Sequence, residues 1–179
     1  MEMKAKRVAE TRITMAQVMN PEDANPFGNV HGGVIMKLID TAGGVVAGRH
    51  CRGNVVTASI ERLDFHQPVS IGDLVILKAS LNFVGKTSME VGVRVEAENL
   101  RTGEVRWTAS AHLTFVSLDV NGRPAPVPPL ILETEEDIRR NCEAKLRRQA
   151  RIQAKGNTEA ACSGGGLGEE SRQAEVEGK

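Results

Sequence analysis

The chain has 179 residues, a length that fits one domain and an appendage. Its 23 basic and 23 acidic residues cancel and its aromatic content is only 3%, so neither charge nor stacking aromatics favours a nucleic-acid partner. No apolar run approaches the ~18 residues of a membrane span, and Cys51, Cys142 and Cys162 are widely spaced, which is typical of free thiols in a reducing compartment. We therefore expect a soluble cytoplasmic protein without a membrane partner.

The first third of the chain predicts an extended segment, a loop and a long helix. Residues 6–19 alternate loosely between polar and apolar side chains, which predicts a strand or an extended arm. Residues 21–29 are rich in turn formers, and residues 34–50 follow with helical periodicity. One face of this helix is apolar. Its members are Val34, Ile35, Leu38, Ile39, Ala42, Val45 and Val46.

The opposite face of the helix carries small or apolar residues and one carboxylate, where a solvent-exposed face would be rich in Lys and Glu. It carries Gly33, Met36, Asp40, Gly44 and Ala47. Gly43 and Gly44 are adjacent, and each destabilises a helix interior by ~1 kcal/mol relative to alanine. We therefore expect something to approach this face closely. A second copy of the chain is the simplest cover, and the sequence therefore predicts an obligate homodimer.

Four long stretches after the helix alternate with a period of two and predict strands. They cover residues 54–65, 73–84, 88–99 and 104–118, and hairpin-sized connections join the last three. An antiparallel meander with one apolar face most simply wraps the preceding helix, which gives an α+β fold. We place this domain at residues 1–130.

The C-terminal part divides into a helix and a tail. A proline-rich extended segment over residues 121–129 precedes a capping pattern at Thr134 and Asp137. We expect a C-terminal helix within residues 131–155. Residues 156–179 have few bulky apolar side chains and predict a disordered tail.

Asp40 is the main candidate for chemistry. A carboxylate on a helix face that becomes covered is either paired or used, here as a general base or a nucleophile. A purely structural pair with Lys37 or with a neighbouring subunit's arginine is the alternative. Gly32 and Gly33 offer backbone N–H groups at the positive end of the helix dipole, which suits a developing oxyanion. Gly33 precedes Asp40 by ~10 Å along the axis, so a partner subunit could supply the group that completes a site.

The sequence gives little support to a metal site, a nucleotide-binding loop or a serine hydrolase. The four histidines are scattered and no Cys-x-x-Cys or His-x-x-x-His occurs, so we expect no metal. Residues 80–87 end like a phosphate-binding loop but begin with Ser80 and form a strand hairpin, which excludes a Walker motif. A Gly-x-Ser-x-Gly elbow is also lacking, which disfavours a serine hydrolase.

The run of residues 25–43, Asn-Pro-Phe-Gly-Asn-Val-His-Gly-Gly-Val-Ile-Met-Lys-Leu-Ile-Asp-Thr-Ala-Gly, resembles the hotdog-fold acyl-CoA thioesterases, especially the cytosolic acyl-CoA hydrolase group and its bacterial hexameric relatives. The stretches at 61–73 and 85–91 match the same group in the same order. The resemblance implies a sheet wrapped around a central helix, with two sheets joined edge to edge in a dimer. Trimers of such dimers, that is hexamers, are a further implication.

The resemblance also implies the reaction, which is hydrolysis of an acyl-CoA to a free fatty acid and coenzyme A, with no cofactor besides the substrate. In it Asp40 activates water, Asn25 acts from the other subunit, and the Gly33 N–H polarises the thioester oxygen. Further residues are expected to bind substrate: His31, Gly32, Thr57, Arg62, Lys86, Thr87 and Ser88. A non-catalytic acyl-CoA binding protein and an enoyl-CoA hydratase-like enzyme with His31 as its acid-base group stay as alternatives.

Overall fold

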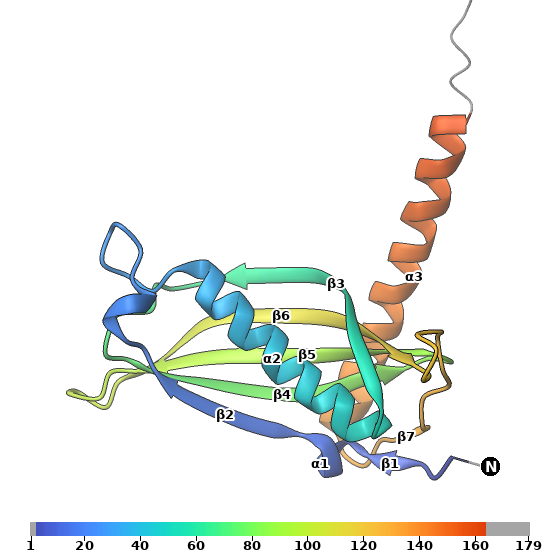
Figure 1. The fold of residues 1–179 in the computed structure, drawn as a ribbon, viewed down its shortest axis with the longest axis horizontal. Coiled ribbons are helices and arrows are strands. Elements are labelled where there is room, and N and C mark those ends of the chain that lie inside the picture. Colours follow the sequence, from blue (N-terminus) through green and yellow to red (C-terminus); the bar gives the residue numbers. More distant parts are fainter. Residues whose placement is uncertain (1–2, 164–179) are drawn as a thin grey trace, which may run out of the picture. The chain divides into compact units, whose positions relative to one another are not determined.

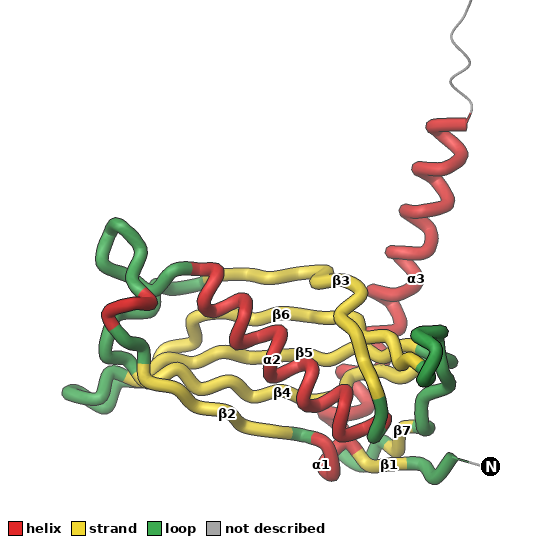
Figure 2. The backbone as a smooth tube through the Cα atoms, in the orientation of Figure 1, coloured by secondary structure: helices red, strands yellow, loops and turns green. Residues whose placement is uncertain are grey.

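The computed structural model describes residues 3–163, with side chains described as far as residue 154. Five strands form one antiparallel sheet in the order β2-β4-β5-β6-β3, and helix α2 lies across one face of it (Figures 1 and 2). In chain order the elements are β1 (Lys6–Arg7), α1 (Val8–Thr11), β2 (Ile13–Val18), the 3-10 turn η1 (Pro21–Asp23), α2 (Gly32–Cys51), β3 (Asn54–Phe65), β4 (Leu74–Val84), β5 (Ser88–Glu98), β6 (Val105–Leu118), β7 (Leu130–Ile131) and α3 (Glu135–Ser163).

The α+β prediction and its long strands are confirmed. Each of β3 to β6 begins and ends within one residue of the limits that the alternation predicts, and α2 extends slightly beyond both ends of the predicted helix. The single strand expected over residues 6–19 is wrong, because the one-turn helix α1 divides it. Glu10 accepts a hydrogen bond from the Arg7 N–H at 3.0 Å and Val8 is buried, so the turn is capped and anchored. Strand β1 then pairs with β7 instead of joining the main sheet.

The core forms between α2 and the inner face of the sheet. Its buried arc on α2 is centred on Ile39 and Val46, and the strands contribute Leu77, Val95, Leu113 and other apolar side chains. The placing of Val45 in this face is wrong, since 41% of that residue is exposed. Val45 lies about 120° around the helix from Ile39, just outside the arc that the sheet covers.

One of the two adjacent helix glycines serves the core of a single chain. A Cβ on Gly43 would lie 2.9 Å from a ring carbon of Phe115, which is itself buried on β6. A Cβ on Gly44 would meet the same ring at an ordinary 3.8 Å. The expectation that both glycines admit an outside partner is therefore wrong for Gly43, which lets the helix approach the sheet.

Strand β3 lies at one edge of the sheet, and among the described strands it hydrogen-bonds only to β6. Its pairing with β6 shifts register twice, between Thr57 and Ser59 and between Ile60 and Arg62. Such irregularities bend a strand and increase its local twist. The free edge of β3 is thus long but uneven.

The C-terminal end of α2 is closed by the buried imidazole of His50, which bonds the Pro128 carbonyl at 2.8 Å. Because Pro128 offers only an acceptor, the ring Nε2–H donates, and the buried Nδ1 has no acceptor for a second proton among the described residues, so the neutral ring is the form that fits. Burial is the largest cause that lowers the pKa of His50 below 6.5, ahead of the opposing bond to Pro128. A proton on this ring would therefore cost stability.

The chain divides into two compact units, and the first ends at Ala144. In the first unit, the opening turns of α3 contact the outer face of β4, where Asn141 donates to the Asn82 carbonyl at 2.9 Å and Arg140 donates to the Ser80 hydroxyl at 3.0 Å. The second unit, as described, is the remainder of α3. This helix continues beyond residue 155, where the sequence predicts its end, to Ser163; the remaining part of the expected disordered tail, residues 164–179, lies outside the described residues.

None of the described helices is long and apolar enough to cross a bilayer. The cysteines whose side chains are described, Cys51 and Cys142, are free thiols, as predicted, while Cys162 lies outside that part of the chain.

Candidate active site

The N-terminus of α2 is capped by the side chain before it. The Nδ1 atom of His31 accepts a hydrogen bond from the Gly33 N–H at 3.0 Å, and the His31 N–H donates to the Asp23 carbonyl at 2.8 Å. The first bond satisfies a donor that a helix start otherwise leaves free. The Gly33 N–H is therefore engaged here, and a substrate oxygen can reach it only after the imidazole turns away. Gly32 is the other donor of the pair.

Asn25 organises the loop before α2. Its Oδ1 accepts from the Phe27 N–H at 2.9 Å and from the Asn29 N–H at 3.3 Å, and its own N–H donates to the Asn29 carbonyl at 2.7 Å. Gly28 completes the turn with φ +80°, a left-handed value that favours glycine. The turn-forming role expected of Asn25 is thus present, and the turn displays Phe27 to solvent.

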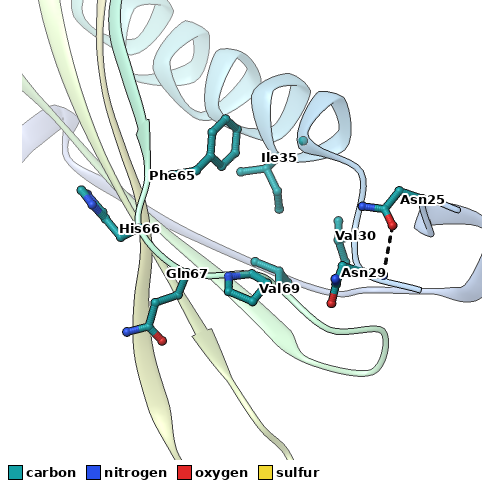
Figure 3. A pocket seen from close by; sticks show the side chains of 10 residues that line it. Asn25, Asn29, Val30, Ile35, Phe65, His66, Gln67 and Val69 are labelled. Carbon is teal, nitrogen blue, oxygen red and sulfur yellow. Dashed lines mark hydrogen bonds between the residues drawn. The ribbon is translucent and has the colours of Figure 1, made fainter. Parts of the chain in front are cut away.

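A hollow of about 400 Å³ lies between this loop, the start of α2 and the segment after β3 (Figure 3). Phe65 points toward Ile35 across it, whereas the His66 side chain points to the other side of the strand. The complete lining is Asn25, Asn29, Val30, Gly32, Ile35, Phe65, His66, Gln67, Pro68 and Val69. A mostly apolar hollow with a few amides is typical of a small-molecule site.

Asp40 lies midway along α2 and does not line the hollow. Its Oδ1 accepts a hydrogen bond from the Thr57 hydroxyl on β3 at 2.6 Å. Within the described residues Asp40 forms no ion pair with Lys37, so the structural alternative of a local pair is not realised. The carboxylate is half-buried and fixed by one short bond to the neighbouring strand.

The side chains expected to bind substrate fall into separate places in one chain. Arg62 lies on the second half of β3 and bonds Asp64 at 2.6 Å. The hairpin with Lys86, Thr87 and Ser88 lies at the far end of the sheet from the hollow, because β5 begins there and runs 11 residues toward it. At about 3.4 Å per residue that separation is roughly 35 Å. The chain by itself does not unite the predicted set.

An apolar strip on α2 and β3 consists of Met36 and Val45 on the helix and Ile60 on the strand, all of them exposed. Ile60 shares the helix-facing side of β3 with Thr57, which bonds Asp40. Val56 is also exposed but points to the opposite face of the sheet. Of the small-residue face predicted from the sequence, Gly33 and Met36 are exposed in a single chain, Asp40 and Gly44 are half-buried, and Ala47 is buried.

Sequence reasoning did not single out the segment 65–69, which forms one wall of the hollow. Its signal was present, because Phe65, His66 and Gln67 belong to the stretch 61–73 that carries the family resemblance. No group of three or more His, Cys, Asp or Glu side chains able to hold a metal occurs within the part of the chain that the structure describes.

Comparisons with known proteins agree on one family. Residues 27–104 match the family model of the thioesterase superfamily. The chain is 40% identical over 151 residues to the uncharacterized acyl-CoA thioester hydrolase YkhA of Bacillus subtilis, a match that covers 84% of this chain and 88% of that protein. It is 38% identical over 155 residues to the cytosolic acyl coenzyme A thioester hydrolase of Rattus norvegicus; 85% of this chain is covered but only 41% of the rat protein, so the chain spans about two fifths of that relative.

A solved structure described as an apo-hexameric acyl-CoA thioesterase aligns with a TM-score of 0.82 at 36% identity. The alignment covers 85% of this chain and 97% of that one.

Proposed function

Because this chain belongs to the hotdog-fold acyl-CoA thioesterases of the thioesterase superfamily, we propose that it hydrolyses acyl-CoA thioesters to a free fatty acid and coenzyme A. The sheet wrapped around α2 is the fold that the resemblance implied. The relatives, which are named as acyl-CoA thioester hydrolases, support the reaction class. The observation that carries the mechanism is the Asp40 carboxylate, fixed by Thr57 on a helix face that its own chain leaves open.

In the proposed reaction Asp40 removes a proton from a water molecule, whose oxygen attacks the thioester carbonyl carbon. The carbon–sulfur bond then breaks, the fatty acid leaves with the water oxygen, and the coenzyme A thiolate takes up a proton. The hydroxyl of Thr57 holds the carboxylate in one orientation. Backbone N–H groups of Gly32 and Gly33 would stabilise the negative carbonyl oxygen, with His31 turned away from Gly33. The reaction needs no metal and no separate cofactor.

We propose that two chains complete each site. If two β3 edges pair antiparallel about a twofold axis, the Phe65 end of one strand lies beside the Thr57 half of the other. Asn25 and the hollow of one subunit would then face Asp40 of its partner, and the exposed apolar strip would be covered. The hairpin at 86–88 of the partner would approach the same end, which would gather the dispersed binding residues. A trimer of such dimers is proposed from the hexameric relative.

We also propose a cytoplasmic location, since the rat relative is cytosolic by name. A hydratase that used His31 as its acid-base group gains no support from the relatives, which are named as thioester hydrolases.

The proposal is tested first by Asp40→Asn, which keeps an acceptor for Thr57 but removes the base. Thiol release from acyl-CoA should fall by about 10²–10⁴-fold, while the oligomer and its folding stay intact. Glu104→Gln, which neutralises an exposed carboxylate outside the site, is the control and should be unaffected. Hydrolysis by Asp40→Asn within a few-fold of the parent would reject the assignment.

A mixing experiment tests the shared site. Asn25→Ala and Asp40→Asn should each be inactive, but subunit exchange between them creates dimers in which one site has both native residues. Random exchange should restore about a quarter of the parent activity. If exchange is shown to occur and activity stays absent, Asn25 and Asp40 do not act across the seam.

A further inference from the structure

The outer face of the sheet carries an exposed aromatic group near the hollow. The Trp107 ring lies 4.2 Å from the His66 ring between centroids, tilted by 50°, and the Arg94 guanidinium carbon stands 4.9 Å from the Trp107 centroid. Trp107 is 44% exposed, although it is the largest side chain type and the chain contains one tryptophan and no tyrosine. We call His66, Arg94 and Trp107 the Trp107 ledge.

The ledge is fixed in place. The indole Nε1–H donates to the Ala109 carbonyl at 3.0 Å, which holds the ring against its own strand. Arg94 is held by Glu96 at 2.8 Å, and Lys78 reaches the same carboxylate at 2.7 Å. The Lys78 bond, the largest cause, together with Arg94 lowers the pKa of Glu96, which keeps that carboxylate ionised. Within this cluster Arg94 and Lys78 carry one positive charge more than Glu96 balances.

The ledge is continuous with the hollow through His66. This residue belongs to the lining of the hollow, and Figure 3 shows its side chain pointing away from the Phe65 side of the strand. Its ring contacts that of Trp107. A ligand that fills the hollow and leaves it past His66 would therefore run onto the indole. The ring and the guanidinium together offer a flat, weakly hydrated surface beside positive charge.

We propose that the Trp107 ledge binds the adenine base of the acyl-CoA substrate, an inference that rests on the proposed function. A purine stacks on aromatic rings and on guanidinium planes, and the substrate's phosphates complement the excess positive charge of Arg94 and Lys78. Two other roles compete with this one. In the first, the indole serves only to shield the register shift between β5 and β6 beside it. In the second, it contacts a second copy of the chain.

Intrinsic fluorescence reports on the ledge alone, because Trp107 is the one tryptophan and no tyrosine is present. Titration of the full chain with adenosine 3′,5′-bisphosphate should quench or shift the emission in a saturable way. Ribose phosphate and pantetheine, which lack the base, should not. Absence of a nucleotide effect overturns the proposal, and so does an emission change that depends only on protein concentration, which would indicate a second copy as the occupant.

Kinetics separate base recognition from chemistry. For Trp107→Leu, kcat/KM for acyl-CoA should fall about tenfold through KM, the order expected for one stacked base. For the same acyl group on pantetheine, kcat/KM should not change. Trp107→Phe should recover most of the loss, and Val105→Ala, an exposed apolar site on the same strand, is the matched control.

An equal loss of kcat/KM on both substrates, or no loss on either, overturns the proposal that the Trp107 ledge binds adenine. If the parent protein hydrolyses neither substrate the proposed function fails, and the fluorescence titration still decides whether the ledge binds a purine nucleotide.

Discussion

Adding one methyl group at each of two neighbouring glycines gives a direct test of how α2 packs. Gly43→Ala and Gly44→Ala both gain ~1 kcal/mol of helix propensity. At Gly43 the new Cβ would lie 2.9 Å from one ring carbon of Phe115, closer than real Cβ contacts, and 3.0 Å from a second. Phe115 is only 2% exposed and cannot swing outward, so overpacking should cost ~1–3 kcal/mol. At Gly44 the nearest contact is 3.8 Å and no such cost applies.

Both variants gain the same helix propensity, so the difference between their free energies of unfolding measures the cost of packing against Phe115. Gly43→Ala should be less stable than Gly44→Ala by ~1–3 kcal/mol, or by about 2–12 °C in Tm for a chain of this length. Urea and thermal unfolding at one fixed protein concentration measure it, because oligomerisation shifts apparent stability. Equal stability of the two variants would refute the packing argument. A loss confined to Gly44→Ala, with dissociation of the oligomer, would show instead that a partner closely approaches that glycine.

Three further outcomes are expected. Thr57→Val removes the hydroxyl that orients Asp40; a bond to a charged group is worth ~1.5–3 kcal/mol, so kcat should fall at least about tenfold in a thiol-release assay while folding is retained. The free energy of unfolding should decrease as pH falls below about 6.5, because the pKa of His50 is lower in the folded chain and the unfolded chain then binds more protons; His50→Gln should flatten this dependence in urea titrations. Arg106→Met leaves the buried Asp73 without the partner that it meets at 2.7 Å, which should cost ~3–5 kcal/mol of stability by chemical unfolding.

The two substitutions that remove a side-chain partner each have a matched control. Thr41→Val removes a hydroxyl that bonds a helix carbonyl, and should leave kcat unchanged. Arg139→Met breaks exposed ion pairs on α3 and should leave the unfolding midpoint unchanged. A parent stability that is constant between pH 7 and pH 5 would contradict the role given to His50, as would a slope that survives His50→Gln.

The sequence predicts the sheet well because its strands are long and alternate without interruption. The residues of β4 and β5 keep one apolar face over 11 positions each, so few other arrangements satisfy them. The division of residues 6–19 could not be foreseen, since α1 depends on the tertiary burial of Val8 and on the pairing of β1 with β7, a strand far away in the sequence. The role of Gly43 likewise depends on the ring of Phe115, which local periodicity does not contain.

The candidate site was predictable as a set of residues but not as an arrangement. A helix wheel places Asp40 on the less apolar face, and the loop composition marks Asn25 as a turn former. The cap that His31 makes to Gly33 depends on a side-chain rotamer, and the Thr57 bond depends on how β3 bends at its register shifts. The contact between His66 and Trp107 joins a residue just after β3 to a residue on β6, so no spacing in the sequence reveals it.

The two register shifts in β3 also limit what this border strand can assemble with. A straight, regular border would accept any extended peptide and could propagate into fibrils. Because β3 bends at its register shifts, a neighbouring strand can form a full set of hydrogen bonds only if it bends at matching positions. A second copy of the chain, related by a twofold axis, has such bends. Growth along this border would then stop at two.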